Sequence, residues 1–480
     1  MTDRPKARAV RGFQDRRAES LAAEERIIAA VARTYESFGF ERLESPAVEY
    51  ADALGKFLPD ADRPNAGVFA FQDDDEQWLA LRYDHTAPLA RFAAENWAQL
   101  AKPFRRYAFG PVWRDEKPGP GRYRQFMQCD ADTVGSARPE ADAEIIAMAA
   151  AGYAAAGLPA GACIIRINNR KLLNGLLAAQ GIASEAQRLA VLRAVDKLDR
   201  LGAAGVADLL GAGRLDESGA FTRGAELSRT AIDAVLAFLA GRQPSRRATL
   251  DALSGSASAE AAEGVAELAR IDVALAAMGV DDQAAVIDPA VVRGLEYYTG
   301  AVFEADLVGA EGEENPARFG SVGGGGRYDD LVARFTGAQV PATGFSFGVS
   351  RLAAVLASGT AAKARGPVMI TALESERMDV YLAAAAELRA AGIAAEVYLG
   401  ESGLRAQMKY ADRRSAPAAV ILGADEIAAG QATVKDLDLG RALAGGVEDN
   451  RAWRADRPGQ VTAARADLVA TVAAILAAQS

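Results

Sequence analysis

The chain has 480 residues, half of them hydrophobic, and its 64 acidic and 54 basic side chains give a formal net charge of −10. This length allows two or three domains and a substantial core. The sequence holds no uncharged apolar run of about 18 residues, so we expect no membrane span.

Residues that bind metals or form disulfides are scarce. The chain has one histidine, His85, and its two cysteines, Cys129 and Cys163, are not spaced as a metal-binding pair. The first residues include basic ones but lack the apolar segment of a secretory signal. We therefore expect a protein of the reducing cytoplasm with no metal site, whose chemistry does not depend on several histidines.

The first predicted element is a helix over residues 18–38, in which apolar side chains recur at helical spacing. Gly39 ends this helix, and residues 39–50 are predicted to form a strand that reaches Pro46. Residues 78–83 are strand-like, and a helix is predicted to start at Thr86 with that residue as its cap.

The junction around Asp84, His85 and Thr86 is a usual place for ligand contacts, because it joins a strand to a helix. The alternative is that Asp84 and Thr86 only cap the helix. We expect His85 to be a packed or solvated residue and not a catalyst.

Residues 102–135 predict an antiparallel hairpin. Two strand-like runs are separated by the sequence Pro-Gly-Pro-Gly at residues 118–121, which forces a turn and suggests a mobile tip. Residues 102–124 hold seven Lys/Arg and two acids in a chain that is acidic overall. This charge indicates an anionic ligand; the alternative is a solvated hairpin with ordinary surface arginines.

The middle of the chain is mainly helical in pattern. An alanine-rich helix over residues 140–157 precedes a strand at residues 163–167 and a further helix. Residues 182–280 show helical spacing with short glycine breaks and no strand candidate of weight. We interpret this segment as a helical insertion.

Three short segments follow that combine strands with glycine. Val302 and Phe303 belong to a predicted strand, and four consecutive glycines at residues 323–326 allow a close approach to a ligand. They are not a Walker loop, since the Gly-Lys-Ser/Thr ending is absent. Residues 344–348 predict another strand, with Arg351 on the first turn of the helix after it.

A new domain is predicted after residues 365–367, where strand-like runs alternate with helices in an α/β pattern. Arg405, Lys409 and Arg413 recur every four residues, which places them on one helix face. This face is either a binding surface or simply solvated.

These motifs resemble those of a known enzyme class. Residues 113–116, Trp-Arg-Asp-Glu, and residues 122–126, Arg-Tyr-Arg-Gln-Phe, resemble motif 2 of class II aminoacyl-tRNA synthetases. Residues 293–300, Arg-Gly-Leu-Glu-Tyr-Tyr-Thr-Gly, resemble a signature of histidyl-tRNA synthetases, with Glu296 replacing the usual Asp. Residues 39–50 and 344–351 more weakly resemble motifs 1 and 3 of class II synthetases. Residues 323–329 resemble a second signature of the histidyl family, and the last domain resembles class IIa anticodon-binding domains.

The resemblance implies an α+β fold: an antiparallel sheet with helices forms the catalytic core from residues 1–181 and 281–362. Residues 182–280 would be the helical insertion and residues 366–480 an α/β anticodon-binding domain. Motif 1 would form the interface of a homodimer.

The implied activity is ATP-dependent formation of histidyl-adenylate and transfer of histidine to the 3′ end of tRNA(His). Magnesium would accompany ATP, without a tightly bound cofactor. By resemblance the catalytic residues are Arg114 and Arg293; histidine is bound by Asp84, Thr86, Gln128, Asp132, Tyr297 and Tyr298; ATP is bound by Arg114, Glu116, Phe126 and Arg351; and tRNA is bound by Lys117, Arg405, Lys409 and Arg413.

Two other functions stay open. One is a non-catalytic synthetase-like subunit that regulates histidine biosynthesis, although such proteins normally lack the last domain and lose signature residues. The other is a class II-fold amide-forming ligase without an RNA partner. The loop at residues 117–121 also departs from bacterial relatives, whose polar side chains there help to read the extra 5′ guanine of the tRNA.

Overall fold

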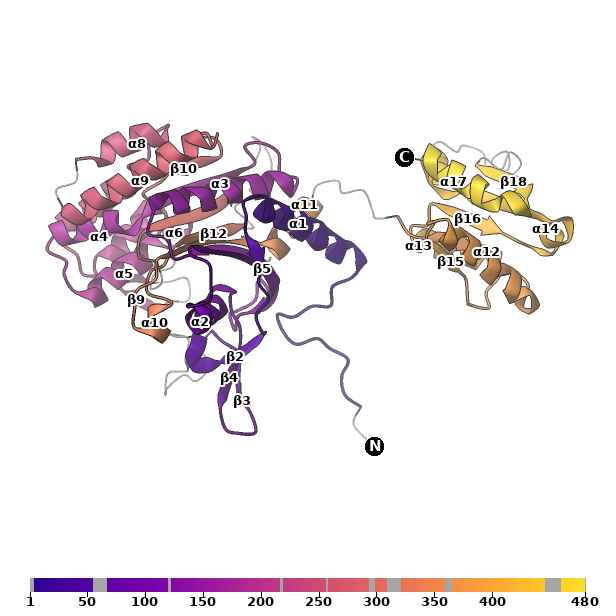
Figure 1. The fold of residues 1–480 in the computed structure, drawn as a ribbon, viewed down its shortest axis with the longest axis horizontal. Coiled ribbons are helices and arrows are strands. Elements are labelled where there is room, and N and C mark those ends of the chain that lie inside the picture. The colour runs from indigo at the N-terminus through magenta and orange to yellow at the C-terminus, as the bar shows by residue number, and fades with distance from the viewer. Residues whose placement is uncertain are drawn as a thin grey trace. The chain divides into compact units, whose positions relative to one another are not determined.

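The structure is a computed structural model that describes residues 4–54, 67–119, 122–215, 219–255, 258–292, 298–308, 321–358, 365–444 and 459–479. The chain divides into two compact units, Met1–Thr360 and Ala361–Ser480 (Figure 1). Each unit has a β-sheet and a core of its own.

The first unit is built on an eight-stranded sheet of order β1-β5-β6-β13-β12-β11-β7-β10. The strands are β1 (Glu41–Arg42), β5 (Phe104–Trp113), β6 (Gln125–Val134), β7 (Cys163–Asn169), β10 (Ala285–Ile287), β11 (Ala301–Leu307), β12 (Gly323–Arg327) and β13 (Ala342–Gly348). Only the outer pairs β1–β5 and β7–β10 are parallel. The predicted antiparallel sheet with flanking helices is therefore confirmed, as is the hairpin, which β5 and β6 form.

One face of this sheet is apolar and covered by helices. Cys129, Phe345 and Phe347 project from β6 and β13 into one core with Tyr35. The helices that pack onto this core include α1 (Ala18–Ser37), α3 (Pro139–Ala155), α8 (Arg246–Leu253), α9 (Ala259–Ala277) and α11 (Val349–Ser358). Figure 1 shows α1 and α3 along the same side of the sheet. The other face is left for polar side chains, because strand residues alternate between faces.

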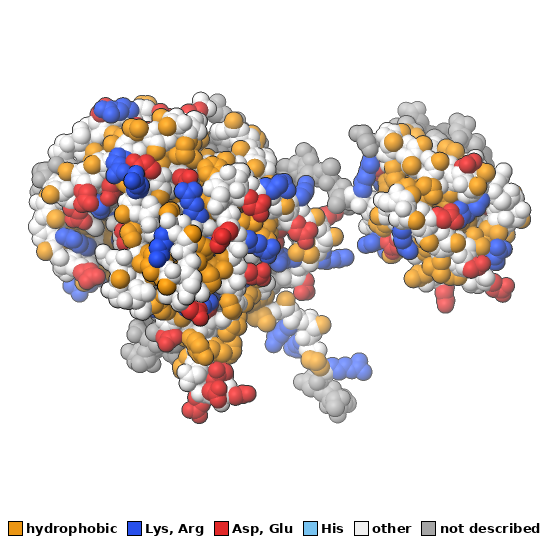
Figure 2. Space-filling model, in the orientation of Figure 1, with side chains coloured by type: hydrophobic (Ala, Val, Ile, Leu, Met, Phe, Trp, Pro, Cys, Tyr) orange, Lys and Arg blue, Asp and Glu red, His pale blue; other side chains and the backbone are white. Residues whose placement is uncertain are grey.

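A small three-stranded sheet stands beside the main one, with order β2-β4-β3. Its strands are β2 (Val48–Tyr50), β3 (Ala70–Gln72) and β4 (Trp78–Leu81), and α2 (Thr86–Asn96) follows β4. The single strand predicted over residues 39–50 is wrong: β1 and β2 are separate and belong to different sheets. Pro46 lies between them, where its missing backbone N–H interrupts no ladder. Acidic side chains gather at the free end of the β3–β4 hairpin (Figure 2).

The segment predicted as a helical insertion contains α5 (Glu185–Val195), α6 (Leu198–Leu210) and α7 (Arg229–Leu239) as well as α8 and α9. With α4 (Arg170–Ala179), the first three share a separate core, whereas α8 and α9 pack into the core of the main sheet. The prediction of no strand is wrong, because β8 (Gly213–Leu215) and β9 (Phe221–Arg223) form a hairpin. Strands of three residues are too short to show an alternating pattern in the sequence.

The second unit is an α/β layer, as predicted, with strand order β15-β14-β16-β17-β18. Its strands are β14 (Val368–Ile370), β15 (Ala395–Val397), β16 (Ala418–Ile421), β17 (Gln431–Asp436) and β18 (Gln460–Ala464); its helices are α12 (Met378–Ala390), α13 (Leu404–Arg413), α14 (Ala424–Ala429), α15 (Leu437–Ala444) and α17 (Leu468–Ala478). Within the described part of the chain, no helix has the length and apolarity needed to cross a membrane.

Candidate active site

The polar face of the main sheet carries a row of buried polar side chains. Gln128, Asp130 and Asp132 alternate along β6 with Cys129 and Ala131, which lie in the apolar core. An amide and two carboxylates therefore line the opposite face within a single strand. Buried groups of this kind need partners or a ligand, since an unpaired polar group is costly away from water.

Glycines on the neighbouring strands make room for this row. Gln128 pairs with Gly110 on β5 and Gly348 on β13, and Asp132 pairs with Gly344. A Cβ atom at Gly344 would lie 2.0 Å from Asp132 Oδ1, so the aspartate side chain lies across that glycine. A side chain at Gly344 would collide with Asp132, and one at Gly110 would collide with Arg82.

Asp132 is held at both ends of its carboxylate. Tyr328 donates its hydroxyl to Oδ1, and Arg106 Nη2 lies 2.9 Å from Oδ2. Burial raises the pKa of Asp132 to about 6, while Arg106 and the Tyr328 hydrogen bond act to lower it. This position was predicted to bind the imidazole of histidine, and both Arg106 and Tyr328 were missed.

Asp130 is a further carboxylate that the sequence interpretation missed. It accepts a hydrogen bond from the Ser346 hydroxyl at 2.5 Å, and burial raises its pKa. Its Oδ2 atom and Gln128 Oε1 are buried and have no hydrogen-bond partner among the described residues. The row thus offers unused acceptors to a ligand that donates hydrogen bonds.

The Asp84 carboxylate lies at the start of α2. It accepts hydrogen bonds from the backbone N–H groups of Thr86 at 3.1 Å and Ala87 at 2.9 Å. The prediction that Thr86 caps this helix is wrong, because Asp84 performs that role and Thr86 is already helical. Burial raises the pKa of Asp84 to about 6, against lowering by these bonds and by Arg114. His85 is buried, as expected of a packed residue, with Nε2 3.3 Å from Gly110 O.

Arg114 joins the hairpin to this loop. Its Nε donates to Tyr83 O at 3.2 Å, and its guanidinium lies 5.2 Å from the centroid of the Phe126 ring. Its positive charge lowers the pKa values of both Asp84 and Asp130. A cation therefore stands between the loop and the carboxylate row, next to an aromatic ring.

The remaining predicted residues of the first unit are less closely grouped. The Tyr298 ring would contact a Cβ atom at Gly326, the partner of Gly344 in the sheet, so Tyr298 and Asp132 lie over paired glycines. Arg351 lies in α11 and donates to Ser321 O. The predicted residues Arg293 and Tyr297 lie outside the described residues.

The predicted tRNA contacts are exposed. Glu116 and Lys117 follow β5 at the start of the hairpin loop, and both are exposed. On α13, three basic side chains are exposed while Gln407 and Ala411 face inward. The exposed basic set is Arg405, Lys409 and Arg413.

Comparison with known proteins identifies the family to which this chain belongs. A family model described as histidyl-tRNA synthetase matches residues 12–352, and one for an anticodon binding domain matches residues 367–450. The chain belongs to the histidyl-tRNA synthetase family. It is 65% identical to a histidine–tRNA ligase of Caulobacter vibrioides, over 98% of this chain and 97% of that one. With a ligase of Brucella suis the identity is 52%, over 100% and 97%.

Solved structures agree with this membership. The histidyl-tRNA synthetase from Nostoc sp. PCC 7120 superposes with a TM-score of 0.73 at 29% identity, over 98% of this chain and 99% of that one. A Bacillus halodurans structure titled both ATP phosphoribosyltransferase regulatory subunit and histidyl-tRNA synthetase gives a TM-score of 0.66 at 23% identity, over 85% of this chain and 97% of that one. At that identity the second likeness concerns the fold alone.

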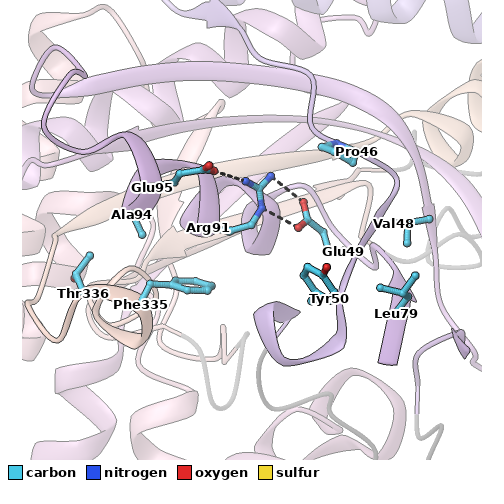
Figure 3. Close-up of a pocket in the computed structure, with 10 residues that line it drawn as sticks. All are labelled: Pro46, Val48, Glu49, Tyr50, Leu79, Arg91, Ala94, Glu95, Phe335 and Thr336. Atoms are coloured by element: carbon cyan, nitrogen blue, oxygen red, sulfur yellow. Dashed lines mark hydrogen bonds and ion pairs between the residues drawn. The ribbon is translucent and has the colours of Figure 1, made fainter. Parts of the chain in front are cut away.

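A separate pocket of about 750 Å³ lies beside the small sheet (Figure 3). It does not include the carboxylate row of Gln128, Asp130 and Asp132. Arg91 crosses it and is paired with Glu49 at 2.8 Å and Glu95 at 2.9 Å. Its other lining residues are Pro46, Val48, Tyr50, Leu79, Ala94, Phe335 and Thr336. Since its charges are already paired and no predicted catalytic residue lines it, the carboxylate row remains the candidate active site.

Proposed function

We propose that this chain is a histidine–tRNA ligase that activates histidine with Mg·ATP and then transfers the histidyl group to the 3′ end of tRNA(His). The observation that carries this proposal is 65% identity with a histidine–tRNA ligase across both units. The buried carboxylate row supports it, because histidine offers N–H donors at both its ammonium and imidazole ends.

The imidazole is assigned to Asp132 and Tyr298. A neutral imidazole has one donor and one acceptor, so a carboxylate accepts from one nitrogen while a phenol donates to the other. The glycines beneath both side chains support this assignment, since they let the Asp132 carboxylate and the Tyr298 ring lie close against neighbouring strands of the same sheet. Tyr297 is assigned to the same pocket through the family signature.

The α-ammonium group is assigned to Asp84, Thr86 and Gln128. The Asp84 carboxylate is partly shielded from water, where an ammonium ion forms a strong charge-assisted hydrogen bond. The unpartnered Oε1 of Gln128 supplies a second acceptor. Together these three residues would fix the end of histidine that carries the reacting carboxylate.

Activation joins two anions, the carboxylate of histidine and the α-phosphate of ATP. Arg114 and Arg293 are assigned to opposite sides of this centre, where fixed positive charge stabilises the oxygens on which charge develops. Glu116 and Arg351 are assigned to ATP, and adenine to the face of the Phe126 ring. Mg²⁺ bound to the ATP phosphates would neutralise the leaving pyrophosphate.

Transfer requires tRNA, for which we propose Lys117 and the exposed basic face of α13, Arg405, Lys409 and Arg413. We also propose a cytoplasmic homodimer joined through the segment around Pro46. Exposed apolar side chains nearby support this interface: Val48, Tyr50 and Phe335 are 38%, 57% and 39% exposed. Sedimentation of the purified chain tests the dimer.

Exchange of labelled pyrophosphate into ATP tests the activity. Exchange that needs histidine, followed by charging of a tRNA(His) transcript, is the expected result. The regulatory-subunit alternative predicts neither reaction, and an amide ligase predicts activation without tRNA charging. Exchange that ignores histidine would overturn the proposal.

A further inference from the structure

A fully buried arginine lies beneath the candidate histidine site. Arg106 on β5 has 0% exposure and is the largest fully buried side chain in the described part of the chain. It pairs with Asp132 in the sheet register, so both side chains share the polar face. Burying a guanidinium is costly unless it is paired, so its position calls for a physical reason.

One nitrogen of Arg106 connects the two ends of that site. Nη2 lies 2.9 Å from Asp132 Oδ2 and donates to the backbone carbonyl of His85 at 2.8 Å. Asp132 is assigned to the imidazole, and His85 stands between Asp84 and Thr86, which are assigned to the ammonium group. The same nitrogen is therefore ion-paired at the imidazole end of the site and hydrogen-bonded at the ammonium end.

The other Arg106 nitrogens support the interpretation that this residue serves the site and not only the fold. Nε and Nη1 are buried and have no hydrogen-bond partner among the described residues. A side chain present only to stabilise the fold normally satisfies its donors, as Arg246 does with Asp272 and the carbonyls of Val280, Asp281 and Ala285. Arg106 instead makes one hydrogen bond, to His85 O, and one ion pair, to the Asp132 carboxylate, whose Oδ2 has no hydrogen-bond partner among the described residues. Its two contacts thus lie one in each half of the site.

We propose that Arg106 is a positioning residue for histidine selection: it holds Asp132 and the Asp84–Thr86 loop at the separation that matches the length of histidine. This inference rests on the proposed function. Arg106 acts through Asp132 and the loop and does not itself touch the substrate.

The charges around Asp132 support the same role. Arg106 on β5 and the Tyr328 hydroxyl lower the pKa of Asp132, whereas burial and the neighbouring Asp130 carboxylate raise it. Burial and the charges of Arg82 and Arg106 lower the pKa of His85, and Tyr298 lies near Tyr328. Removing the arginine would leave burial and Asp130 opposed by one neutral hydrogen bond, so the carboxyl would bind its proton at a higher pH.

The test is pyrophosphate exchange by full-length wild type, Arg106→Met and Arg106→Lys between about pH 5 and 9, a range that begins below the pKa of about 6 of Asp132. For Arg106→Met we expect the histidine KM to rise about 10- to 100-fold, as for loss of a charged hydrogen bond, with the ATP KM unchanged. The acid limb of kcat/KM for histidine should move up by about one pH unit. Titration of histidine itself is common to all variants, so the difference reports the protein.

Arg106→Lys keeps the charge and should keep the wild-type acid limb, while its shorter reach raises the histidine KM about 3- to 10-fold. Arg246→Lys is the matched control for loss of a buried arginine, and we expect lower stability with both KM values unchanged. Equal rises in the ATP and histidine KM of Arg106→Met, or an unmoved acid limb, would overturn the inference. If Arg106→Met does not fold, the KM split in Arg106→Lys decides alone. A wild type without histidine-dependent exchange contradicts the proposed function instead.

Discussion

The carboxylate of Asp84 caps α2 through the backbone N–H of Thr86, at 3.1 Å, while it lies at the edge of the candidate active site. One side chain thus starts the helix and is assigned to the substrate ammonium. The sequence presented these as alternatives, and the structure makes them compatible.

Because of this double role, we expect Asp84→Asn to bind histidine more weakly and to be more stable at high pH. Burial raises the pKa of Asp84 from 3.8 to about 6, so folding favours the protonated carboxyl. This stabilisation of the folded state is fully present below pH 3.8 and is lost as pH rises through about 6. Asn keeps the cap but does not ionise. We expect equal stability at about pH 4, a gain on the order of 1–3 kcal/mol at pH 8, and a large rise in the histidine KM. Urea unfolding at both pH values measures the gain.

Asp73→Asn is the matched control for that variant. Asp73 accepts the same kind of backbone bonds, from Asp75 at 3.0 Å and Gln77 at 2.8 Å, in a surface turn. It should change neither the pH dependence nor the KM. A stability difference between Asp84→Asn and wild type that is the same at both pH values would contradict the burial argument.

Asp132→Ala should raise the histidine KM strongly and leave the ATP KM nearly unchanged, because a buried imidazole N–H loses its acceptor. Steady-state exchange at varied histidine and ATP measures the split. Asp142→Ala is the control: Asp142 is equally buried and paired with Arg327 at 2.6 Å, and we expect it to lower stability without separating the two constants. If both constants move together in Asp132→Ala, the residue is structural.

Arg293→Ala should slow adenylate formation on the order of 10²–10³-fold with much smaller effects on binding of either substrate. The reason is that a cation aimed at developing negative charge acts mainly in the transition state. Rapid-quench measurement of adenylate separates the chemical step from binding. Arg270→Ala, at an exposed arginine paired with Glu140, provides the comparison. A near wild-type rate in Arg293→Ala would remove the two-cation mechanism.

Deleting residues 366–480 should spare pyrophosphate exchange and weaken tRNA charging, because the second unit has a core of its own. The triple variant Arg405→Ala, Lys409→Ala, Arg413→Ala should do the same and flatten the salt dependence of charging. Arg377→Ala, an exposed arginine of the same unit, is the control. Loss of both activities in a folded, dimeric truncation contradicts this division of labour.

The protein loop at residues 117–121 predicts weak discrimination of the extra 5′ guanine of tRNA(His). Its tip at residues 118–121 is Pro-Gly-Pro-Gly, which has no side-chain donor, and Lys117 suits a phosphate better than the edge of a base. Charging of transcripts with and without that guanine should differ by less than about 10³-fold. A larger loss would show that the loop reads the base.

Sequence patterns alone determined the family, the main helices, the β5–β6 hairpin and the α/β character of the second unit. Those features depend on local information: periodic apolar residues, glycine and proline turns, and short motifs such as residues 293–300. Asp130 could also have been predicted as a site residue, since it lies on the same face as Gln128 and Asp132 in a strand already predicted.

Only the tertiary structure shows which side chains contact the site carboxylates. Arg106 reaches Asp132 from the neighbouring strand β5, and Tyr328 reaches it from just after β12, two strands away from β6. Nothing in either local sequence distinguishes these residues from other buried ones. The separation of β1 from β2 likewise depends on which sheet each strand joins. Strand register and sheet order are set by packing across the whole unit, and these place a buried cation where it can hold both ends of the candidate histidine site.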